Sequence, residues 1–443
     1  MKKYSLIAFI LVYAYRNKSI NINKRGDCEL SKTKKIVLLS IIIFIITPYM
    51  IFANEEEEQN SIEEVNQIIV ETSSDIIDEP KINSRRAIIY DRGSKKILYG
   101  KCENERCAMA STTKIMTAII AIEKSNLNET IEISNKAANT GGSRLGLKKG
   151  DKITKLDLLY GLLLCSGNDA AVALAESISG TVEEFAIVMN SKAKELELIN
   201  TNFVTPHGLD QPEHYTTAYE LAKLADYALN NKLFADIVNT KNYVVNINGI
   251  SKDIHNTNEL LGTLEGVNGV KTGFTNGAGR CLVTSVNRNN MNIICVVLGA
   301  DTKKIRTSDS VKLIEYAYKK YELIELKSKI EKKFEEWNQN SSNYIKIEKG
   351  KEIPKYKMSE LKNTRVPIKK DEVKNLEVVI ENLKKLKAPI NKETIVGSVK
   401  VIIKNEEIYR TNIIVEENIK KMGIFDYYKQ LSNNYMTFLQ KSI

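Results

Sequence analysis

The sequence predicts a fold of the α/β (α+β) class, with an antiparallel sheet, flanking helices and a helical subdomain, followed by a small all-β domain. A β-hairpin pattern over 86–99 comes first. Apolar helical stretches follow between 111 and 230, and a three-strand antiparallel meander over 266–299 comes after them. The length of 443 residues allows one large core and a smaller domain.

Residues 1–53 have the features of an export signal. Lysines precede an apolar run over 36–53, an alanine suited to cleavage ends that run, and four consecutive glutamates follow it. We expect cleavage, although the run is also close to the minimum length of a membrane anchor. In either case the rest of the chain would lie outside the cytoplasm. The acidic, polar composition of 54–82 predicts a flexible linker.

The first candidate for catalysis is a serine and a lysine three residues apart, Ser111 and Lys114. If the chain is helical from Thr112 onward, this spacing places the lysine one turn from the serine, on the same face. A hydroxyl at a helix N-terminus lies near the positive end of the dipole, and a serine is a good nucleophile only when a base takes its proton. The same spacing recurs at three other places, so an ordinary amphipathic helix is the alternative.

A second polar stretch, Ser166 to Asp169, separates an apolar helix predicted over 156–164 from an alanine-rich helix over 170–179. Its simplest interpretation is a turn between two helices with an Asn or Asp cap. The functional alternative is that Ser166 and Asn168 point into a cleft.

The tripeptide Lys271-Thr272-Gly273 occurs once and lies on the first strand of the meander. A glycine within a strand often marks a close approach of the backbone to a ligand, and a glycine-rich surface hairpin is the alternative. A phosphate-binding loop is excluded, because no Gly-x-x-x-x-Gly-Lys-Ser/Thr precedes a helix here. A helix predicted over 311–321 closes the domain, and Arg306 stands just before it.

Other functional classes have little support. The histidines His207, His214 and His255 lack metal-ligand spacing, so we expect no metal site and interpret all three as structural or surface residues. The net charge of +10 suits an anionic envelope or membrane surface, or simply solvated lysines. Interleaved arginine and aromatic residues are lacking, which argues against nucleic acid as a partner.

The cysteines fit an exported protein. Cys102 and Cys107 are close enough in sequence to close a small disulfide loop if they are oxidised. Cys165, Cys281 and Cys295 lie in apolar segments and are expected to be core thiols.

Together the three motifs occur in the order typical of penicillin-binding proteins and class A β-lactamases: Ser-x-x-Lys, Ser-x-Asn about 55 residues later, and Lys-Thr-Gly about 100 further on. The blocks at 110–118, 166–171, 206–209 and 270–273 resemble those of the low-molecular-mass penicillin-binding proteins. These are the serine-type D-alanyl-D-alanine carboxypeptidases of the β-lactamase/transpeptidase-like superfamily. The resemblance covers roughly residues 80–440 and implies that 83–322 is a catalytic penicillin-binding domain.

The resemblance also implies a reaction that needs no metal or cofactor. Ser111 would attack the penultimate D-alanine carbonyl of a peptidoglycan stem peptide, and Lys114 would take its proton. A lysine with a reference pKa of about 10.4 must be shifted down to do so, by burial and by a nearby cation. Ser166 would pass a proton to the leaving D-alanine, and Asn168 would orient Lys114.

Five further residues would bind the substrate in this resemblance. Lys271 would supply positive potential. Thr272 would bind the terminal carboxylate, and Gly273 completes the same tripeptide. Arg306 is the candidate to share the binding of the carboxylate. The backbone N–H groups of the nucleophile and of Phe274 would form the oxyanion hole. β-Lactam antibiotics, which mimic the acyl donor, should acylate the serine and leave slowly.

Three alternatives stay open within the resemblance. A class A β-lactamase would add a glutamate with an asparagine four residues later, but Glu195 and Glu197 are followed at that distance by Ile199 and Thr201. A cross-link endopeptidase uses the same residues. A non-catalytic wall receptor would bind substrate or penicillin without turnover.

The C-terminal part changes character. Short strands predicted at 342–347, 376–380, 398–403 and 407–415 indicate a small β-rich domain over 323–417, similar to the second domain of this family. Its expected role is to hold the active site off the membrane. Residues 418–443 include an amphipathic helix that could lie on the membrane surface or pack against the β domain. We therefore expect an exported protein at the outer face of the cytoplasmic membrane or in the cell wall.

Overall fold

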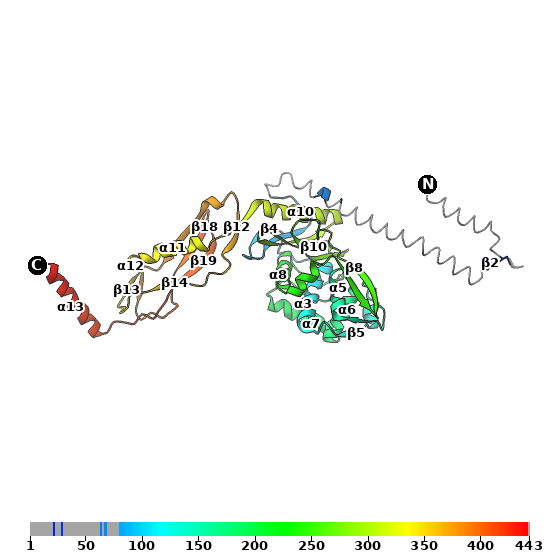
Figure 1. Cartoon of the computed structure of the whole chain (residues 1–443), viewed down its shortest axis with the longest axis horizontal. Helices are drawn as coiled ribbons and strands as arrows, with labels where there is room; N and C mark the ends of the chain where they lie inside the picture. Colours follow the sequence, from blue (N-terminus) through cyan, green and yellow to red (C-terminus); the bar gives the residue numbers. More distant parts are fainter. Residues whose placement is uncertain (1–20, 23–27, 30–62, 64–65, 69–78, 442–443) are drawn as a thin grey trace. The chain divides into compact units, whose positions relative to one another are not determined.

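The computed structural model describes residues 21–22, 28–29, 63, 66–68 and 79–441 (Figure 1). The apolar run of the predicted export signal and most of the predicted linker lie outside these residues. β1 (Asn21–Ile22) and β2 (Cys28–Glu29) form a short antiparallel pair. Among the helices that are described, none is both long and apolar enough to cross a bilayer.

A five-stranded sheet with the order β4-β3-β11-β10-β9 is the centre of the larger domain. All neighbouring strands are antiparallel. The strands are β3 (Arg86–Asp91), β4 (Ile97–Lys101), β9 (Val267–Thr275), β10 (Gly279–Arg288) and β11 (Met291–Ala300). The predicted hairpin and meander are therefore confirmed, and the pairing of β3 with β11 joins them into one sheet. The middle of β10 and of β11 is buried on both faces, which explains the apolar run Ile293–Leu298 in β11.

Helices cover both faces of this sheet. α10 packs on β10 and β11 on one side, and α8 packs on β3 and β11 on the other, together with the remaining helices (Figure 1). The helices are η1 (Ala110–Thr113), α3 (Lys114–Lys124), α4 (Asn135–Ala138), α5 (Lys155–Leu163), α6 (Asn168–Ser179), α7 (Val182–Glu195), α8 (Ala218–Leu229), α9 (Lys232–Val238) and α10 (Lys303–Lys320). Two small hairpins pair β5 (Thr130–Glu132) with β6 (Lys152–Thr154), and β7 (Asn242–Ile247) with β8 (Ile250–His255). The predicted α+β class is confirmed.

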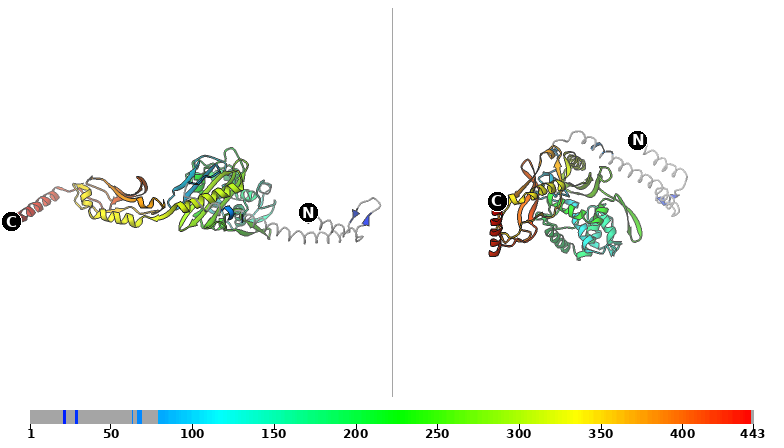
Figure 2. Two further views of the ribbon diagram at one scale, coloured as in Figure 1. Left: turned by 90° about the horizontal axis from the view of Figure 1, so that it is seen from above. Right: turned by 60° about the vertical axis from the view of Figure 1, so that its left-hand side comes forward.

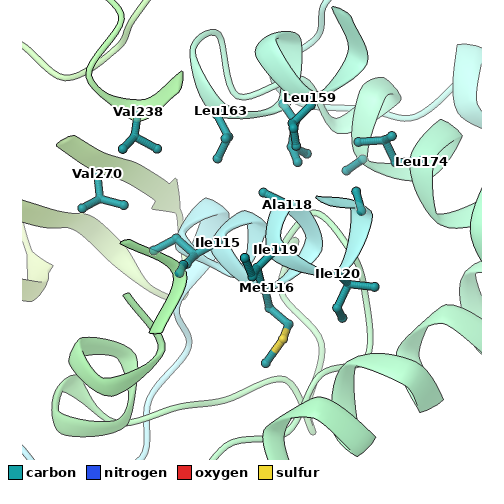
Figure 3. Packing of buried hydrophobic residues seen from close by; sticks show 14 of the residues in the cluster. Ile115, Met116, Ala118, Ile119, Ile120, Leu159, Leu163, Leu174, Val238 and Val270 are labelled. Atoms are coloured by element: carbon teal, nitrogen blue, oxygen red, sulfur yellow. The ribbon is translucent and has the colours of Figure 1, made fainter. Parts of the chain in front are cut away.

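Helix α3 is enclosed by other elements, and all of its residues from 114 to 121 are buried. A helix that is buried on every side needs apolar residues on every side, which the sequence of α3 provides. Figure 3 shows its side chains among residues of α5, α6, α9 and β9: Ile115, Met116, Ala118, Ile119, Ile120, Leu159, Leu163, Leu174, Val238 and Val270. This packing fixes the position of Lys114, the first residue of α3.

Two predicted helices begin earlier than expected, and both differences concern candidate site residues. α6 begins at Asn168, so this residue belongs to the first turn of the helix. α10 begins at Lys303 rather than at 311, so Arg306 lies within the helix and not before it. The side chain of Thr302 accepts a hydrogen bond from the backbone N–H of Ile305 at 3.1 Å and caps α10 at this earlier point.

The C-terminal domain contains a four-stranded antiparallel sheet with the order β14-β19-β18-β16. Its elements are β12 (Tyr321–Glu325), α11 (Lys327–Gln339), α12 (Ser341–Tyr344), β13 (Lys346–Glu348), β14 (Tyr356–Met358), β15 (Arg365–Lys369), η2 (Val373–Asn375), β16 (Leu376–Asn382), β17 (Lys385–Lys387), β18 (Ile395–Ile403) and β19 (Glu406–Val415). The last three predicted strands are confirmed. The strand predicted at 342–347 was wrong, because α12 and β13 share that segment.

Helix α11 is an element that the sequence analysis missed. It runs along the sheet of the C-terminal domain and contacts β16 and β18 (Figure 2). Ile330, Phe334 and Trp337 lie on one face of the helix and are buried in the domain core. Their spacing of four and three residues is a helical signal, but the many charged residues between them obscured it.

The predicted C-terminal helix is present as α13 (Ile424–Lys441). Apolar side chains near its start are exposed, with 74% exposure for Ile424, 89% for Phe425 and 74% for Leu431. These side chains therefore do not pack against the β domain, which was one of the two expectations for this helix.

Cys102 and Cys107, which could close a small loop if oxidised, are both free thiols in this structure. Cys102 lies exposed in the turn after β4 with φ +46°, while Cys107 is half-buried and pairs with Thr216 through backbone hydrogen bonds. Cys281 and Cys295 are buried and Cys165 is partly buried, as expected for core thiols.

Candidate active site

Ser111 and Lys114 meet at the start of α3. Ser111 lies in the 3-10 turn η1, directly before the helix, and Nζ of Lys114 lies 2.8 Å from its Oγ. The lysine side chain is fully buried, whereas Ser111 is partly exposed. The predicted spacing of one turn therefore places the amine in hydrogen-bond contact with the hydroxyl.

Two other groups complete the surroundings of the Lys114 amine. Oδ1 of Asn168 accepts from Nζ at 2.7 Å, and the backbone carbonyl of His207 accepts at 2.9 Å. Nδ2 of Asn168 donates to the carbonyl of Gly141 at 2.7 Å, which fixes the orientation of the amide. A carbonyl and an amide oxygen can only accept, so they take both N–H groups of a neutral amine. The remaining position, a lone pair, then faces the Ser111 hydroxyl.

The electrostatics favour this neutral amine. Burial, followed by the positive charge of Lys271, holds the pKa of Lys114 well below its usual value. Burial also lowers the pKa of Lys271 to about 7, and the Arg306 guanidinium acts in the same direction. The burial of Lys114 and the adjacent positive charge of Lys271 both favour the neutral form of the Lys114 amine.

Strand β9 lies directly against the turn that contains the nucleophile. A Cβ on Gly273 would lie 3.2 Å from the backbone nitrogens of both Ser111 and Thr112. A glycine at this position lets the strand approach the turn so closely. The next residue, Phe274, has an exposed side chain, and the Arg280 guanidinium stacks on its ring at 3.7 Å.

The turn η1 is supported from behind by His214. Its Nδ1 accepts from the backbone N–H of Val204 at 2.9 Å, so Nε2 carries the proton and donates to Oγ1 of Thr113 at 2.8 Å. The Thr113 hydroxyl in turn donates to the carbonyl of Ala110 at 2.8 Å. Burial lowers the pKa of His214 to about 4 and that of His207 to about 3, so both rings are neutral at pH 7. The structural interpretation of these two histidines fits their contacts.

Two non-glycine residues adopt left-handed backbone conformations at this site: Ala110 with φ +48° and Ser166 with φ +61°. Such conformations cost about 1–3 kcal/mol and persist only where the surrounding contacts enforce them. Ser166 is buried at the junction of α5 and α6, two residues before Asn168. Of the two motif residues at this junction, Asn168 contacts the Lys114 amine.

The predicted carboxylate-binding residues already have hydrogen-bond or ion-pair partners within the protein. Nζ of Lys271 donates to the carbonyl of Thr272 at 3.0 Å, and the Thr272 hydroxyl is 2.6 Å from the hydroxyl of Thr257. The guanidinium of Arg306 is almost fully buried and forms an ion pair with Glu259. Arg306 is therefore not a free cation at the edge of the site. Thr257, Glu259 and the His207 carbonyl were not predicted from the sequence, because their contacts join segments that are far apart along the chain.

Asp169 is a further residue without an earlier interpretation. Its buried carboxylate accepts backbone N–H groups at 2.8–3.0 Å from Leu145, Gly146, Leu147 and Ala170. It thereby holds the loop that also contains the Gly141 carbonyl, the partner of Asn168.

Asp169→Asn is expected to lower the free energy of unfolding by about 1–3 kcal/mol. The asparagine carries no charge, and its NH₂ group is a donor, so it cannot accept the backbone N–H groups that the second carboxylate oxygen accepts. Urea denaturation would measure the loss. Asp151→Asn is the matched control, since the carboxylate of Asp151 accepts one backbone N–H, from Lys148, and the side-chain amide of Asn248, both at exposed positions. An equal loss in both variants would contradict the buried role of Asp169.

Comparisons with known proteins agree with this geometry. A family model described as D-alanyl-D-alanine carboxypeptidase matches residues 73–302, and the model of the penicillin-binding protein 5 C-terminal domain matches residues 332–421. The D-alanyl-D-alanine carboxypeptidase DacF of Bacillus subtilis is 34% identical over 366 residues, which cover 80% of this chain and 90% of that protein. DacC of Escherichia coli is 32% identical, with 79% and 87% covered.

Solved structures give the same result. The crystal structure of the D-alanyl-D-alanine carboxypeptidase DacD from Francisella tularensis has a TM-score of 0.62 and 28% identity, covering 79% of this chain and 97% of that one. Penicillin-binding protein 5 from Haemophilus influenzae has a TM-score of 0.63 and 26% identity, covering 78% and 100%. The resemblance drawn from the motifs is confirmed, and the chain belongs to the D-alanyl-D-alanine carboxypeptidase family.

Proposed function

We propose that this protein is a serine-type D-alanyl-D-alanine carboxypeptidase that removes the terminal D-alanine from peptidoglycan stem pentapeptides through an acyl-enzyme on Ser111. The observation that supports this most directly is the Lys114 amine, whose two acceptor-only partners leave a lone pair directed at the Ser111 hydroxyl. This is the arrangement that a nucleophilic serine requires of its base.

In the acylation step, Oγ of Ser111 attacks the carbonyl carbon of the penultimate D-alanine, and its proton passes to Nζ of Lys114. The backbone N–H groups of Ser111 and Phe274 would stabilise the oxyanion that forms, and the close approach of Gly273 to the Ser111 nitrogen supports this assignment. When the C–N bond breaks, the hydroxyl of Ser166 gives its proton to the leaving amine and takes the proton held by Lys114, so D-alanine departs and Lys114 is neutral again. Water then attacks the ester, and Lys114 takes its proton. That proton returns to Oγ of Ser111 when the ester C–O bond breaks and the shortened peptide leaves.

Substrate recognition uses the cationic side of the site. Lys271, buried between the Lys114 region and Arg306, supplies positive potential where the terminal carboxylate binds. The Thr272 hydroxyl, held by Thr257, donates to that carboxylate, and Arg306 would share the task once its ion pair with Glu259 yields. β-Lactams carry a comparable carboxylate and an acyl donor, so the same residues account for slow-releasing inhibition.

The cellular setting follows from the same proposal. An enzyme acting on stem peptides works outside the cytoplasm, at the outer face of the membrane or in the wall. The exposed apolar side chains at the start of α13, with tyrosines at 427, 428 and 435, suit insertion into a membrane interface. The β domain would then hold the catalytic domain off the membrane.

The test combines mass spectrometry of a pentapeptide ending in D-Ala-D-Ala with labelling by a fluorescent penicillin. The full-length protein should release one alanine and become labelled, and Ser111→Ala should lose both activities by about a thousandfold or more. Ser191→Ala is the matched control, because Ser191 has the same spacing to Lys194 on α7 but lies outside the site. It should retain both activities.

Each other outcome has a distinct meaning. Labelling without alanine release would favour a cross-link endopeptidase or a non-catalytic receptor. Alanine release by Ser111→Ala would remove this serine from the mechanism.

A further inference from the structure

A buried ion pair lies at the carboxylate-binding side of the site. Nη2 of Arg306 contacts Oε1 of Glu259, and their side chains are only 4% and 8% exposed. The hydroxyl of Thr307 donates to the same carboxylate oxygen. Among the described residues, Oε2 of Glu259 and Nε of Arg306 are buried atoms that have no hydrogen-bond partner. The pair is thus almost fully buried and incompletely satisfied.

The segment that carries Glu259 is attached to the strand of the Lys-Thr-Gly tripeptide. Thr257 contacts the Thr272 hydroxyl at 2.6 Å, and Nδ2 of Asn258 donates to the carbonyl of Gly269 at 3.1 Å. The backbone N–H of Thr257 also donates to the carbonyl of Leu164, two residues before Ser166. A carboxylate bound by Thr272 would therefore lie close to the Glu259–Arg306 pair.

We propose that Glu259 is a positioning residue that holds Arg306 in an ion pair in the free enzyme and competes with the substrate's terminal carboxylate for its guanidinium. This inference rests on the proposed function, in which Thr272 and Arg306 receive that carboxylate. A guanidinium has five N–H donors, and Glu259 leaves at least the Nε donor free. Two carboxylates near one guanidinium repel each other, so Glu259 weakens the binding of the anionic substrate and favours release of D-alanine.

Glu259→Gln tests this competition, because it removes the charge and keeps the shape. The new amide group fits at the position of Oε2, which has no hydrogen-bond partner to lose. The probes are benzylpenicillin and its methyl ester, which differ only in the carboxylate charge. We expect the second-order acylation rate of the acid to rise about five- to tenfold and that of the ester to stay unchanged. D-alanine should also inhibit the variant at lower concentration.

The control is the same substitution in an Arg306→Gln background, where the gain for the acid should vanish because the shared guanidinium is gone. Equal changes for acid and ester, or an undiminished gain without Arg306, would overturn the proposal. A thermal melt shows whether each variant is folded. If Glu259→Gln does not fold, Glu259→Asp should give a smaller gain for the acid alone, and a parallel change for acid and ester would count against competition.

These readouts are independent of peptide hydrolysis. Loss of the proposed carboxypeptidase activity would appear as a wild-type protein that acylates with penicillin but releases no D-alanine. Failure of the inference would appear instead as an unchanged ratio between acid and ester.

Discussion

Lys114→Gln is expected to lower the acylation rate of Ser111 at pH 7 by about a thousandfold or more, because an amide cannot take the serine proton. Glutamine can still donate to Asn168 and to the His207 carbonyl, so the pocket loses its base but keeps most of its hydrogen bonds. Stopped-flow labelling with a fluorescent penicillin would measure the rate. Lys194→Gln, in the equivalent spacing after Ser191, is the control and should leave the rate unchanged.

The pH dependence of the same rate gives an independent check. Below the pKa of Lys114 the amine is protonated and cannot accept the serine proton, so acylation should rise as the pH rises through that depressed pKa. Above the pKa of Lys271, about 7 in the free enzyme, the positive potential declines and acylation should fall again. The expected profile is bell-shaped. In Lys114→Gln the acid limb should disappear, and its persistence would show that another group is the base.

Part of the candidate active site could be predicted from sequence, because its residues lie in short local patterns. Ser111 and Lys114 are brought together by one helical turn, and this spacing is visible in the sequence. Ser166 and Asn168 are two residues apart in a polar stretch between two apolar helices, and this break in the apolar pattern is also visible in the sequence. The order of the motifs then identified the family, and with it the sheet that brings Lys271 to the site.

The supporting contacts could not be predicted in the same way. The His207 carbonyl contacts Lys114 across 93 positions of sequence, and Glu259 meets Arg306 across 47. No local period marks such pairs, since they result from packing of whole elements. Arg306 was placed before its helix because the polar first turns of α10 have little apolar periodicity, although Thr302 is a recognisable cap.

Gly208 contacts the turn that contains Ser111, and no sequence pattern reveals this backbone contact. Its φ is +85°, and a Cβ at this position would lie 1.9 Å from the carbonyl oxygen of Ala110 and 2.6 Å from Oγ1 of Thr113. Neither neighbour can move easily. The Ala110 carbonyl is already the acceptor of the Thr113 hydroxyl, and Ala110 itself has a left-handed φ. Any added side chain must displace the turn that contains Ser111.

We therefore expect Gly208→Ala to lower the free energy of unfolding by about 3 kcal/mol or more, through overpacking added to left-handed strain. Gly150→Ala separates the two effects, because Gly150 has φ +86° but no atom within 4 Å of the added Cβ. It should cost only the strain, about 1–2 kcal/mol.

Chemical denaturation would measure both losses in stability. Penicillin labelling, at a temperature where both variants are folded, would measure the reactivity of Ser111. Labelling should fall at least about tenfold for Gly208→Ala alone, since a misplacement of the order of 1 Å is enough to impair attack. Similar stability and labelling in the two variants would mean that η1 tolerates the displacement, and that the contact between Gly208 and Ala110 does not position Ser111.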